Sequence, residues 1–487
     1  MNGCKNEDRM IIPQKGKPRD VILETLKKYK AGDLDWRSGK IFGYIYDPGE
    51  SVRQLINAAY TLFLSENALD PTAYPSLLRL ENEVVRMTAN LLQGDPAVVG
   101  NFTSGGTESI LLAVKTARDM MRARKPSITA PEMVFPLSAH ASFYKAGHYL
   151  GVKPVVVPVH GDSFEADVRA MADAVNENTI LLAASAPGYA HGVIDPIASI
   201  GRLALEKNCL FHVDACVGGI HLAYMRKMGM SVKKFDFSVP GVTSISVDLH
   251  KYGYAAKGAS VILYRHHDIR RFQMFACSRW TGYSVINPTA AGSKSGGPLA
   301  AAWAVLNYLG DEGYQQIVGD TMAATRTLID GINRIDGLRV LGKPDMCLLA
   351  FAAQDPDMDV FHLADRLKQT GWYIQPQFAR GRAPSSLHMT VTRRSARRVT
   401  EFLEVLERTV AALAKEPPVP LRPDIREKIE TMAEDEAPES FLRLARSAGI
   451  SLEQPPQDMA PVNRLLESLP PHIAEDVLTV YLNQLMK

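Results

Sequence analysis

Lys251 is the residue whose position most clearly suggests chemistry. It stands in the segment 246–258, a few residues beyond an apolar run at Ser244–Val247 that we expect to be a buried strand. Ligands of parallel α/β sheets collect at the carboxyl ends of the strands. Partial burial there can lower the pKa of a lysine and make its amine nucleophilic. A single lysine after a strand is more often an ordinary surface residue, so Lys251 needs partners to count as a catalytic candidate.

A phosphate-binding turn is the first such partner. Residues 103–108 (TSGGTE) precede a helical pattern, and their glycines allow a tight turn that exposes the first N–H groups of the helix. Ser104 and Thr107 add hydroxyl donors, and the positive end of the helix dipole favours an anion. By itself, such a turn is more often a plain helix cap.

An acid and a histidine complete the set. Asp214 ends an apolar run, and a buried carboxylate costs free energy of desolvation unless it has a strong partner. A protonated pyridine nitrogen would be such a partner, although a strand-end cap explains Asp214 alone equally well. His140, in the segment 138–143, could lie flat on a cofactor ring or could be a hydrogen-bonded core histidine.

The order of these segments is more informative than any one of them. A phosphate seat, an aromatic side chain, an acid and a lysine, each after a predicted strand of one α/β unit, are the parts that a site for pyridoxal 5′-phosphate (PLP) requires. In these residues the chain resembles the fold-type I PLP enzymes of the group II decarboxylase superfamily, and most closely the sphingosine-1-phosphate lyase family. The likeness covers roughly residues 36–410 and is strongest at 103–110, 191–196, 212–219 and 241–258.

The resemblance implies a role for each matching position. Lys251 would hold PLP covalently, Asp214 would pair with the pyridine nitrogen, and His140 would stack on the ring. Residues 292–297 (GSKSGG) resemble a segment that reaches the neighbouring subunit's cofactor in this family, which implies a homodimer with shared sites. The cofactor-binding residues implied in this way, besides those three, are Ser104, Gly105, Thr107, His250, Ser293, Ser295 and Gly296.

The substrate end of the resemblance is less regular. Tyr46, Asn67 and Lys257 match positions that engage the polar and phosphate end of the substrate in the lyase family, and Lys257 is a further catalytic candidate. The family's Asn-Pro-Leu-His-Pro is Asn-Ala-Leu-Asp-Pro here, so Asp70 replaces a phosphate-binding histidine. Two like charges about 4 Å apart would repel by about 4 kcal/mol at an effective dielectric near 20. We therefore expect Asp70 to pair with a neighbouring base or to turn away as a cap before Pro71, while Lys257 and Tyr46 bind the phosphate.

Several activities are compatible with these parts. The resemblance implies a lyase that cleaves the Cα–Cβ bond of a phosphorylated long-chain amino alcohol to a fatty aldehyde and phosphoethanolamine. The alternatives are a PLP-dependent amino-acid decarboxylase and an aldolase for a different 2-amino-3-hydroxy compound. A scaffold protein would not need Lys251, Asp214 and His140 together. The sequence identifies no base for the hydroxyl proton of the substrate.

Apolar runs and helical patterns alternate around these segments. Helices are expected at 75–92 and 108–124, and short buried strands at 133–136, 154–157, 179–184, 209–213, 244–247 and 260–264. This alternation predicts an α/β fold with a mainly parallel sheet covered by helices, of the seven-stranded type that the resemblance implies. We expect an N-terminal arm (1–60), a large PLP-binding domain (61–315), a smaller C-terminal α/β domain (316–415) and a C-terminal helical extension (416–487) without a recognised counterpart.

The bulk composition excludes several other classes of protein. The 487 residues include 55 basic and 53 acidic side chains, a net charge of +2 that gives no reason to expect nucleic acid as a partner. Five cysteines without C-x-x-C spacing indicate neither disulfides nor a metal site and suit a reducing cytoplasm. No apolar run reaches about 18 residues, so we expect a cytoplasmic protein without the membrane anchor of the family's eukaryotic members, acting on a small-molecule amine.

Overall fold

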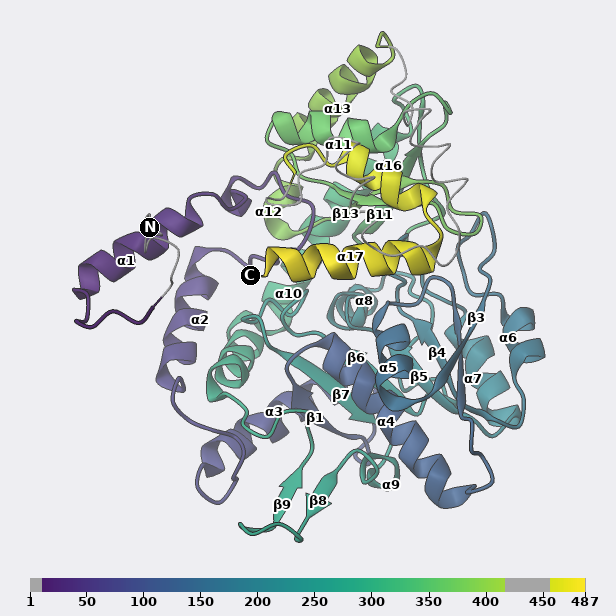
Figure 1. Cartoon of the computed structure of the whole chain (residues 1–487). Coiled ribbons are helices and arrows are strands. Elements are labelled where there is room, and N and C mark those ends of the chain that lie inside the picture. The colour runs from purple at the N-terminus through teal and green to yellow at the C-terminus, as the bar shows by residue number, and fades with distance from the viewer. Residues whose placement is uncertain (1–10, 417–455, 487) are drawn as a thin grey trace, which may run out of the picture.

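The computed structural model describes residues 11–416 and 456–486 and is built around a seven-stranded sheet (Figure 1). The strand order is β1-β7-β6-β5-β4-β2-β3, and only β7 runs antiparallel to its neighbours. The mainly parallel sheet is therefore confirmed, with the edge strand β1 as an addition that the sequence analysis lacked. The strands are β1 (Val99–Thr103), β2 (Glu132–Pro136), β3 (Lys153–Val157), β4 (Thr179–Ser185), β5 (Leu210–Asp214), β6 (Ser244–Val247) and β7 (Ser260–Tyr264).

Helices cover both faces of this sheet because its central strands are apolar on both sides. Along β4, Leu181 and Ala183 join one buried cluster, while Leu182 and Ala184 join the other. This is the alternation that a strand imposes on its side chains. The first cluster includes α4 (Gly106–Arg124) and α5 (Ser142–Leu150), and the second includes α3 (Pro75–Leu91), α7 (Ile197–Glu206) and α8 (Gly219–Lys227). The shorter helices α6 (Val168–Ala174) and α9 (His267–Arg270) lie beside them.

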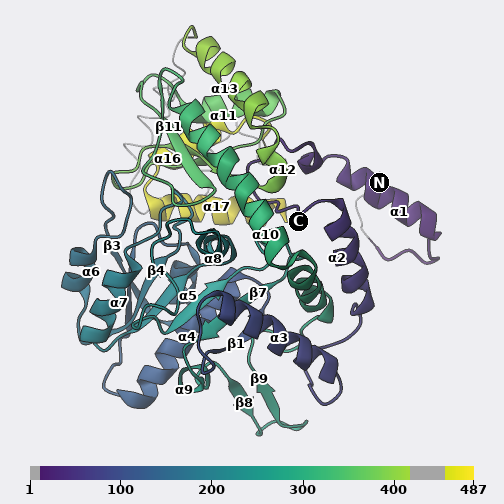
Figure 2. The same cartoon turned by 180° about the vertical axis from the view of Figure 1, so that it is seen from behind.

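A smaller antiparallel sheet follows in the chain, with the order β10-β11-β13-β12. The long helix α10 (Gly296–Ile332) leads to it and shares its core with both sheets (Figure 2). Gly310, at φ +54°, kinks this helix. The other elements are β10 (Leu338–Val340), β11 (Leu348–Ala353), β12 (Gln375–Gln377), β13 (Ser386–Thr390), α11 (Val360–Gln369), α12 (Arg393–Ala396) and α13 (Val399–Leu413).

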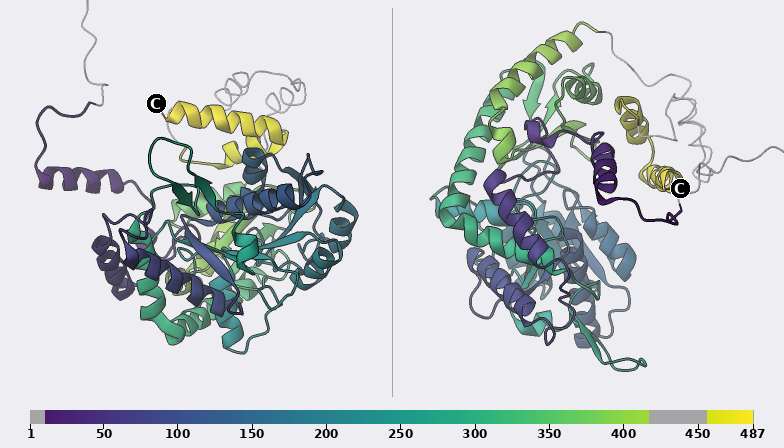
Figure 3. Two further views of the ribbon diagram at one scale, coloured as in Figure 1. Left: turned by 90° about the horizontal axis from the view of Figure 1, so that it is seen from below. Right: turned by 90° about the vertical axis from the view of Figure 1, so that its left-hand side faces the viewer.

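The described ends of the chain lie on the surface. The N-terminal elements are α1 (Arg19–Lys30), η2 (Trp36–Ser38) and α2 (Glu50–Leu62), and α1 buries none of its residues (Figure 3). Two helices of the predicted C-terminal extension are described, α16 (Ala460–Ser468) and α17 (Pro471–Leu485), and α17 runs along the junction between the two sheets. Residues 1–10, 417–455 and 487, which belong to the predicted arm and extension, lie outside the described residues. A small hairpin, β8 (Phe275–Cys277) and β9 (Val285–Asn287), projects from the large sheet. None of the described helices has the length and apolar character needed to cross a membrane.

Candidate active site

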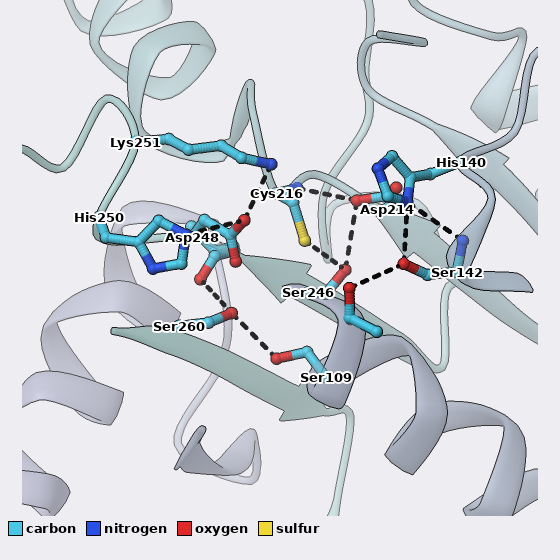
Figure 4. A network of polar contacts seen from close by, with 12 residues as sticks. Ser109, His140, Ser142, Asp214, Cys216, Ser246, Asp248, His250, Lys251 and Ser260 are labelled. Carbon is cyan, nitrogen blue, oxygen red and sulfur yellow. Dashed lines mark hydrogen bonds and ion pairs between the residues drawn. The ribbon is translucent and has the colours of Figure 1, made fainter. Parts of the chain in front are cut away.

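A cavity of 380 Å³ opens where β4, β5 and β6 end and α4 begins. Figure 4 shows the polar side chains that surround it. The structure brings together seven of the residues predicted from the sequence in the lining of this one cavity: Ser104, Gly105, Thr107, His140, Asp214, His250 and Lys251.

Lys251 meets a carboxylate that the sequence analysis did not single out. Its Nζ lies 2.9 Å from Oδ2 of Asp248, a residue only 2% exposed. Burial alone would lower the pKa of Lys251, but the negative charge of Asp248 outweighs it and raises that pKa above its ordinary value. His250 lies on the same carboxylate, with Nε2 3.6 Å from Oδ2. The site therefore holds the lysine amine by an ion pair with a buried carboxylate, and the lowered pKa that partial burial alone would give Lys251 is not found.

Asp214 ends β5 and turns its carboxylate towards the cavity. The Cys216 N–H, at 3.0 Å, and the Ser246 hydroxyl, at 3.5 Å, both donate to its Oδ1. Oδ2 accepts no hydrogen bond from the described residues, so it can bind a cationic partner. Because Asp214 is only 8% exposed, a charged ring nitrogen would be a strong partner for that oxygen.

His140 is oriented by the first turn of α5. Its Nδ1 accepts the backbone N–H of Ser142 at 3.1 Å and lies 2.8 Å from the Ser142 hydroxyl, which itself lies 3.0 Å from the Thr107 hydroxyl. A backbone N–H can only donate, so the neutral imidazole carries its proton on Nε2. These contacts fix the ring plane at the wall of the cavity (Figure 4).

The turn before α4 is both a helix cap and an anion seat. Ser104 donates its N–H and its hydroxyl to Oε2 of Glu108, at 2.6 and 2.8 Å. A Cβ added at Gly106 would lie 2.7 Å from Sγ of Cys216 and 2.9 Å from Oδ2 of Asp248, so no side chain fits there. The glycines thus leave the N–H groups of the first turn open to a phosphate at the positive end of α4.

These features fit PLP. The α4 turn suits its phosphate, Oδ2 of Asp214 suits the ring nitrogen, and the Lys251 amine faces the same cavity. Oδ1 of Asp248 is buried and has no hydrogen-bond partner within the described ranges, which leaves one further acceptor at the site. When bound, the cofactor supplies an electron sink for breaking a bond at Cα of an amine substrate.

Two of the predicted substrate residues lie beside this cavity without lining it. Nζ of Lys257 is 5.3 Å from the ring centroid of Tyr46 and donates to the Tyr44 carbonyl oxygen at 3.0 Å. Burial, and then the charge of Lys251, lower the pKa of Lys257, while burial raises that of Tyr46. The two side chains therefore form a cationic position close to Lys251, with the Lys257 side chain exposed.

The remaining predicted residues form a second cluster that contributes nothing to the lining of the cavity. Asn67 donates from Nδ2 to the Ser293 hydroxyl at 3.2 Å, accepts the Lys294 N–H at 3.0 Å and pairs in a β-bridge with Ser295. Gly296 continues this contact by donating its N–H to the Glu66 carbonyl oxygen at 3.0 Å. The structure thus joins the two segments, around 67 and around 294, to each other.

Asp70 takes one of the two arrangements that its replacement of a histidine predicts. Its Oδ1 accepts the N–H of Thr72 at 2.8 Å and the Thr72 hydroxyl at 2.6 Å. These hydrogen bonds lower the pKa of Asp70, which is exposed. No ion pair of Asp70 occurs in the part of the chain that the structure describes. The acid therefore acts as a turn cap around Pro71.

Sequence reasoning missed Asp248, Cys216 and Tyr189 in the cavity lining. Asp248 had a local signal, since it stands three residues before Lys251 on the same turn. Tyr189 had none, because it is placed by the smaller sheet: its hydroxyl donates to Oε1 of Gln375 at 2.8 Å, and its ring lies 4.1 Å from that of His388.

Comparisons with known proteins agree with this geometry. The family model of the pyridoxal-dependent decarboxylase conserved domain matches residues 5–354, and a model of the C-terminal helix–turn–helix (HTH) domain of pyridoxal-dependent enzymes matches residues 423–484. The second match covers the extension for which the sequence analysis named no counterpart. The sphingosine-1-phosphate lyase of Arabidopsis thaliana is 42% identical over 421 residues, 85% of this chain and 76% of the relative.

Two solved structures extend the comparison. The sphingosine-1-phosphate lyase of Burkholderia pseudomallei matches with a TM-score of 0.79 and 36% identity, over 84% of this chain and 93% of the other. Glutamate decarboxylase of Lactobacillus brevis has a TM-score of 0.74 at 20% identity, over 84% of this chain and 96% of the other, and shares the fold. The fold-type I architecture predicted from the sequence is therefore confirmed.

Proposed function

The chain belongs to the pyridoxal-dependent decarboxylase family and, within it, to the sphingosine-1-phosphate lyases, and on that premise we propose that it cleaves the Cα–Cβ bond of a phosphorylated long-chain amino alcohol. The products would be a fatty aldehyde and phosphoethanolamine. The observation that carries the proposal is the joint placement of Lys251, Asp214 and His140 around one cavity, with the Lys257–Tyr46 cationic position beside it.

Each of these side chains has a task that its surroundings support. Asp214 would pair with a protonated ring nitrogen through Oδ2, and His140, held in one orientation by Ser142, would cover a ring face. The first turn of α4 would bind the cofactor phosphate. Lys251 would hold the cofactor through its amine, beside the negative charge of Asp248.

The substrate's own phosphate needs a separate cation. Lys257 is the candidate, because it lies close to Lys251 and its exposed ammonium can meet an incoming anion. Tyr189 lines the same cavity as Lys251 and would face the hydroxyl group of the substrate. Burial raises the pKa of Tyr189 to about 12, so that at neutral pH its phenol donates a hydrogen bond and does not take up a proton.

The second candidate function is amino-acid decarboxylation. Asp70 favours this activity. It stands where the lyase family has a phosphate-binding histidine, and its carboxylate, which binds Thr72, offers no positive charge to a substrate phosphate. An aldolase acting on a different 2-amino-3-hydroxy compound would use the same parts. The bond that is broken depends on which one the protein holds perpendicular to the cofactor ring.

Product analysis distinguishes these activities. We expect the purified holoenzyme to convert sphingosine phosphate into long-chain aldehyde and phosphoethanolamine in equal amounts, and to release no CO₂ from a panel of amino acids. Lys257→Ala should raise KM for the phosphorylated substrate, and the difference from wild type should shrink at high salt because salt screens the lost attraction. Release of CO₂ from an amino acid, with no aldehyde from the amino alcohol, would replace the lyase by the decarboxylase.

We further propose a homodimer with shared active sites, acting in the cytoplasm on small-molecule amines. The support is the cluster of Asn67 and Ser295, which is well organised yet lies outside the cavity of its own chain. Mixing inactive Lys251→Ala subunits with inactive Ser295→Asp subunits should restore about a quarter of wild-type activity, because half of the dimers would contain one intact site. A strictly monomeric active enzyme on sedimentation would contradict the shared site.

A further inference from the structure

A second cavity of 320 Å³ adjoins the active site. The two cavities share His140 and Tyr189 in their linings. The rest of the second lining is mostly apolar and comes from both sheets: Leu137 and Val159 on one side, and Phe378, Ala383 and Pro384 on the other.

Besides the shared His140, the second lining contains His191, which is uncharged at neutral pH. Burial lowers the pKa of His191 to about 4, and its ring stacks on Phe164 with the centroids 3.9 Å apart. The basic side chain of Arg380 is exposed and lies 5.9 Å from the centroid of the Phe378 ring. The interior of the second cavity therefore suits an apolar group better than a second phosphate.

The C-terminal helices hold the outer wall of this cavity. The loop between β12 and β13 folds back on itself through a bridge between Arg380 and Ala383. Oε1 of Glu467, on α16, accepts both the Ala379 N–H and the Ser385 hydroxyl, each at 2.6 Å. One carboxylate oxygen thus ties together the two limbs of the loop that carries Phe378, Ala383 and Pro384.

Glu467 is itself held firmly. Asp365, on α11, accepts the N–H groups of Met459 and Ala460 at 3.0 and 2.7 Å and so caps α16, and Arg464 pairs with Asp359. Leu466, Leu469, Ile473, Ala474 and Val477 form a buried cluster against which Phe378 packs. Phe378 therefore contacts the C-terminal helices on one side and the cavity on the other.

The loop also lies close against the segment that carries His140. A Cβ added at Gly381 would lie 3.0 Å from Cδ2 of Leu137, and Gly381 has φ +59°. Leu137 is three residues from His140 and belongs to the same cavity wall. Glu467 on α16 holds the loop, and the loop lies against Leu137. A shift of α16 would therefore change the width of the second cavity.

We infer that the second cavity receives the hydrocarbon chain of the substrate, and that Glu467 is a positioning residue that determines which chain lengths are accepted. This rests on the proposed function, because the phosphorylated end of the substrate is assigned to Lys257. The mostly apolar lining next to His140, in which Arg380 is the charged side chain and is exposed, suits the alkyl part of the same molecule. The C-terminal extension thereby helps to determine which substrates the enzyme accepts.

Chain-length dependence tests this inference in the holoenzyme. For phosphorylated amino alcohols of increasing length, kcat/KM of wild type should rise by up to about fourfold per methylene until the cavity is filled. Glu467→Ala should flatten this rise and increase KM for the long homologues at least about tenfold, because each lost buried methylene forfeits that factor. Glu467→Gln, which keeps the accepting Oε1, should restore most of the dependence. The visible absorbance of the cofactor should be the same in all three proteins.

Two further variants test the inference even if Glu467→Ala fails to fold. Ala383→Phe fills the cavity from the opposite limb of the loop and should also remove the preference for long chains. Glu475→Ala, at an exposed position of α17, is the matched control and should behave as wild type. Unchanged chain-length dependence in both Glu467→Ala and Ala383→Phe would overturn the inference.

A binding measurement separates this inference from the proposed activity. Equilibrium dialysis of radiolabelled hexadecanol against the holoenzyme should show weaker binding to Ala383→Phe and Glu467→Ala than to wild type and Glu475→Ala. If no homologue yields aldehyde but this order of affinities holds, the lyase proposal fails and the alkyl site stands. Equal affinities in all four proteins would refute the alkyl site, whatever the activity.

Discussion

Replacing Lys251 by alanine should abolish both turnover and the visible absorbance of the bound cofactor. Lys251 is the lysine that lines the cavity with Asp214 and the α4 turn. Its amine, once it has given up a proton, is the nucleophile available there for a covalent bond to PLP. Removing the nucleophile of a covalent mechanism typically costs several orders of magnitude, so we expect a loss of at least about a thousandfold in kcat. Absorbance spectra of the purified variant and a product assay measure the two effects.

A matched substitution separates this effect from a general loss of charge. Lys234 is an exposed lysine of the same large unit, and Lys234→Ala should keep both the spectrum and the turnover. Lys257 is the informative second case, since Lys257→Ala should keep the absorbance while binding the phosphorylated substrate less tightly. Normal turnover in Lys251→Ala would show that Lys251 is not the lysine that binds the cofactor.

Replacing Asp248 by asparagine should destabilise the cofactor-free protein by about 3 kcal/mol at pH 7, because it leaves the half-buried amine of Lys251 without its counter-charge. Burial alone would raise the pKa of Asp248, but the charges of Lys251 and His250 lower it below its ordinary value. The free energy of unfolding, measured by urea titration, reports the loss. Asp320→Asn, at an exposed position of α10, should leave it unchanged.

The pH dependence of this difference follows from the two pKa shifts. A carboxylate whose pKa is lowered on folding stabilises the protein above its unfolded pKa, near about 4, and loses that contribution as the pH falls further. A lysine whose pKa is raised contributes fully below its unfolded pKa, near about 10, and loses this as the pH rises further. The difference between wild type and Asp248→Asn should be constant between about pH 5 and pH 9 and shrink below about pH 4. An equally large difference at pH 3 would exclude the ion pair as its cause.

The large sheet could be predicted because each of its strands is specified by a short stretch of neighbouring residues. Strands such as β4 and β6 are short apolar runs, and the burial of both faces follows from their composition. The edge strand β1 was not expected, since its sequence (VGNFT) contains Gly100 and Asn101 and lacks an apolar pattern. β12, with the sequence QPQ, is recognisable as a strand only through its pairing with β13.

The inner part of the candidate site could be predicted for the same reason. Asp214, His140 and Lys251 follow strands of one parallel sheet, and the carboxyl ends of such strands meet at one edge. Tyr189 and the second cavity could not be predicted, because their surroundings come from far along the chain. Gln375 holds the Tyr189 hydroxyl across a separation of 186 residues, and Glu467 reaches Ala379 from 88 residues away.

Asp70 shows what a mismatch with a family pattern can and cannot indicate. Electrostatics alone required Asp70 to avoid a bound phosphate, but two arrangements satisfied that requirement. The choice depended on Thr72, whose hydroxyl and N–H both bind the carboxylate two residues away. A hydroxyl at that spacing makes a local turn that needs no neighbouring base.

Reduction with borohydride followed by peptide mapping tests the central claim most directly. Borohydride converts the bond between a lysine and PLP into a stable secondary amine, which mass spectrometry locates after proteolysis. The account predicts one pyridoxyl group per chain, on Lys251, in the peptide that also contains Asp248 and His250. A label on Lys257 or Lys294, or no label in a protein that still turns over its substrate, would contradict it.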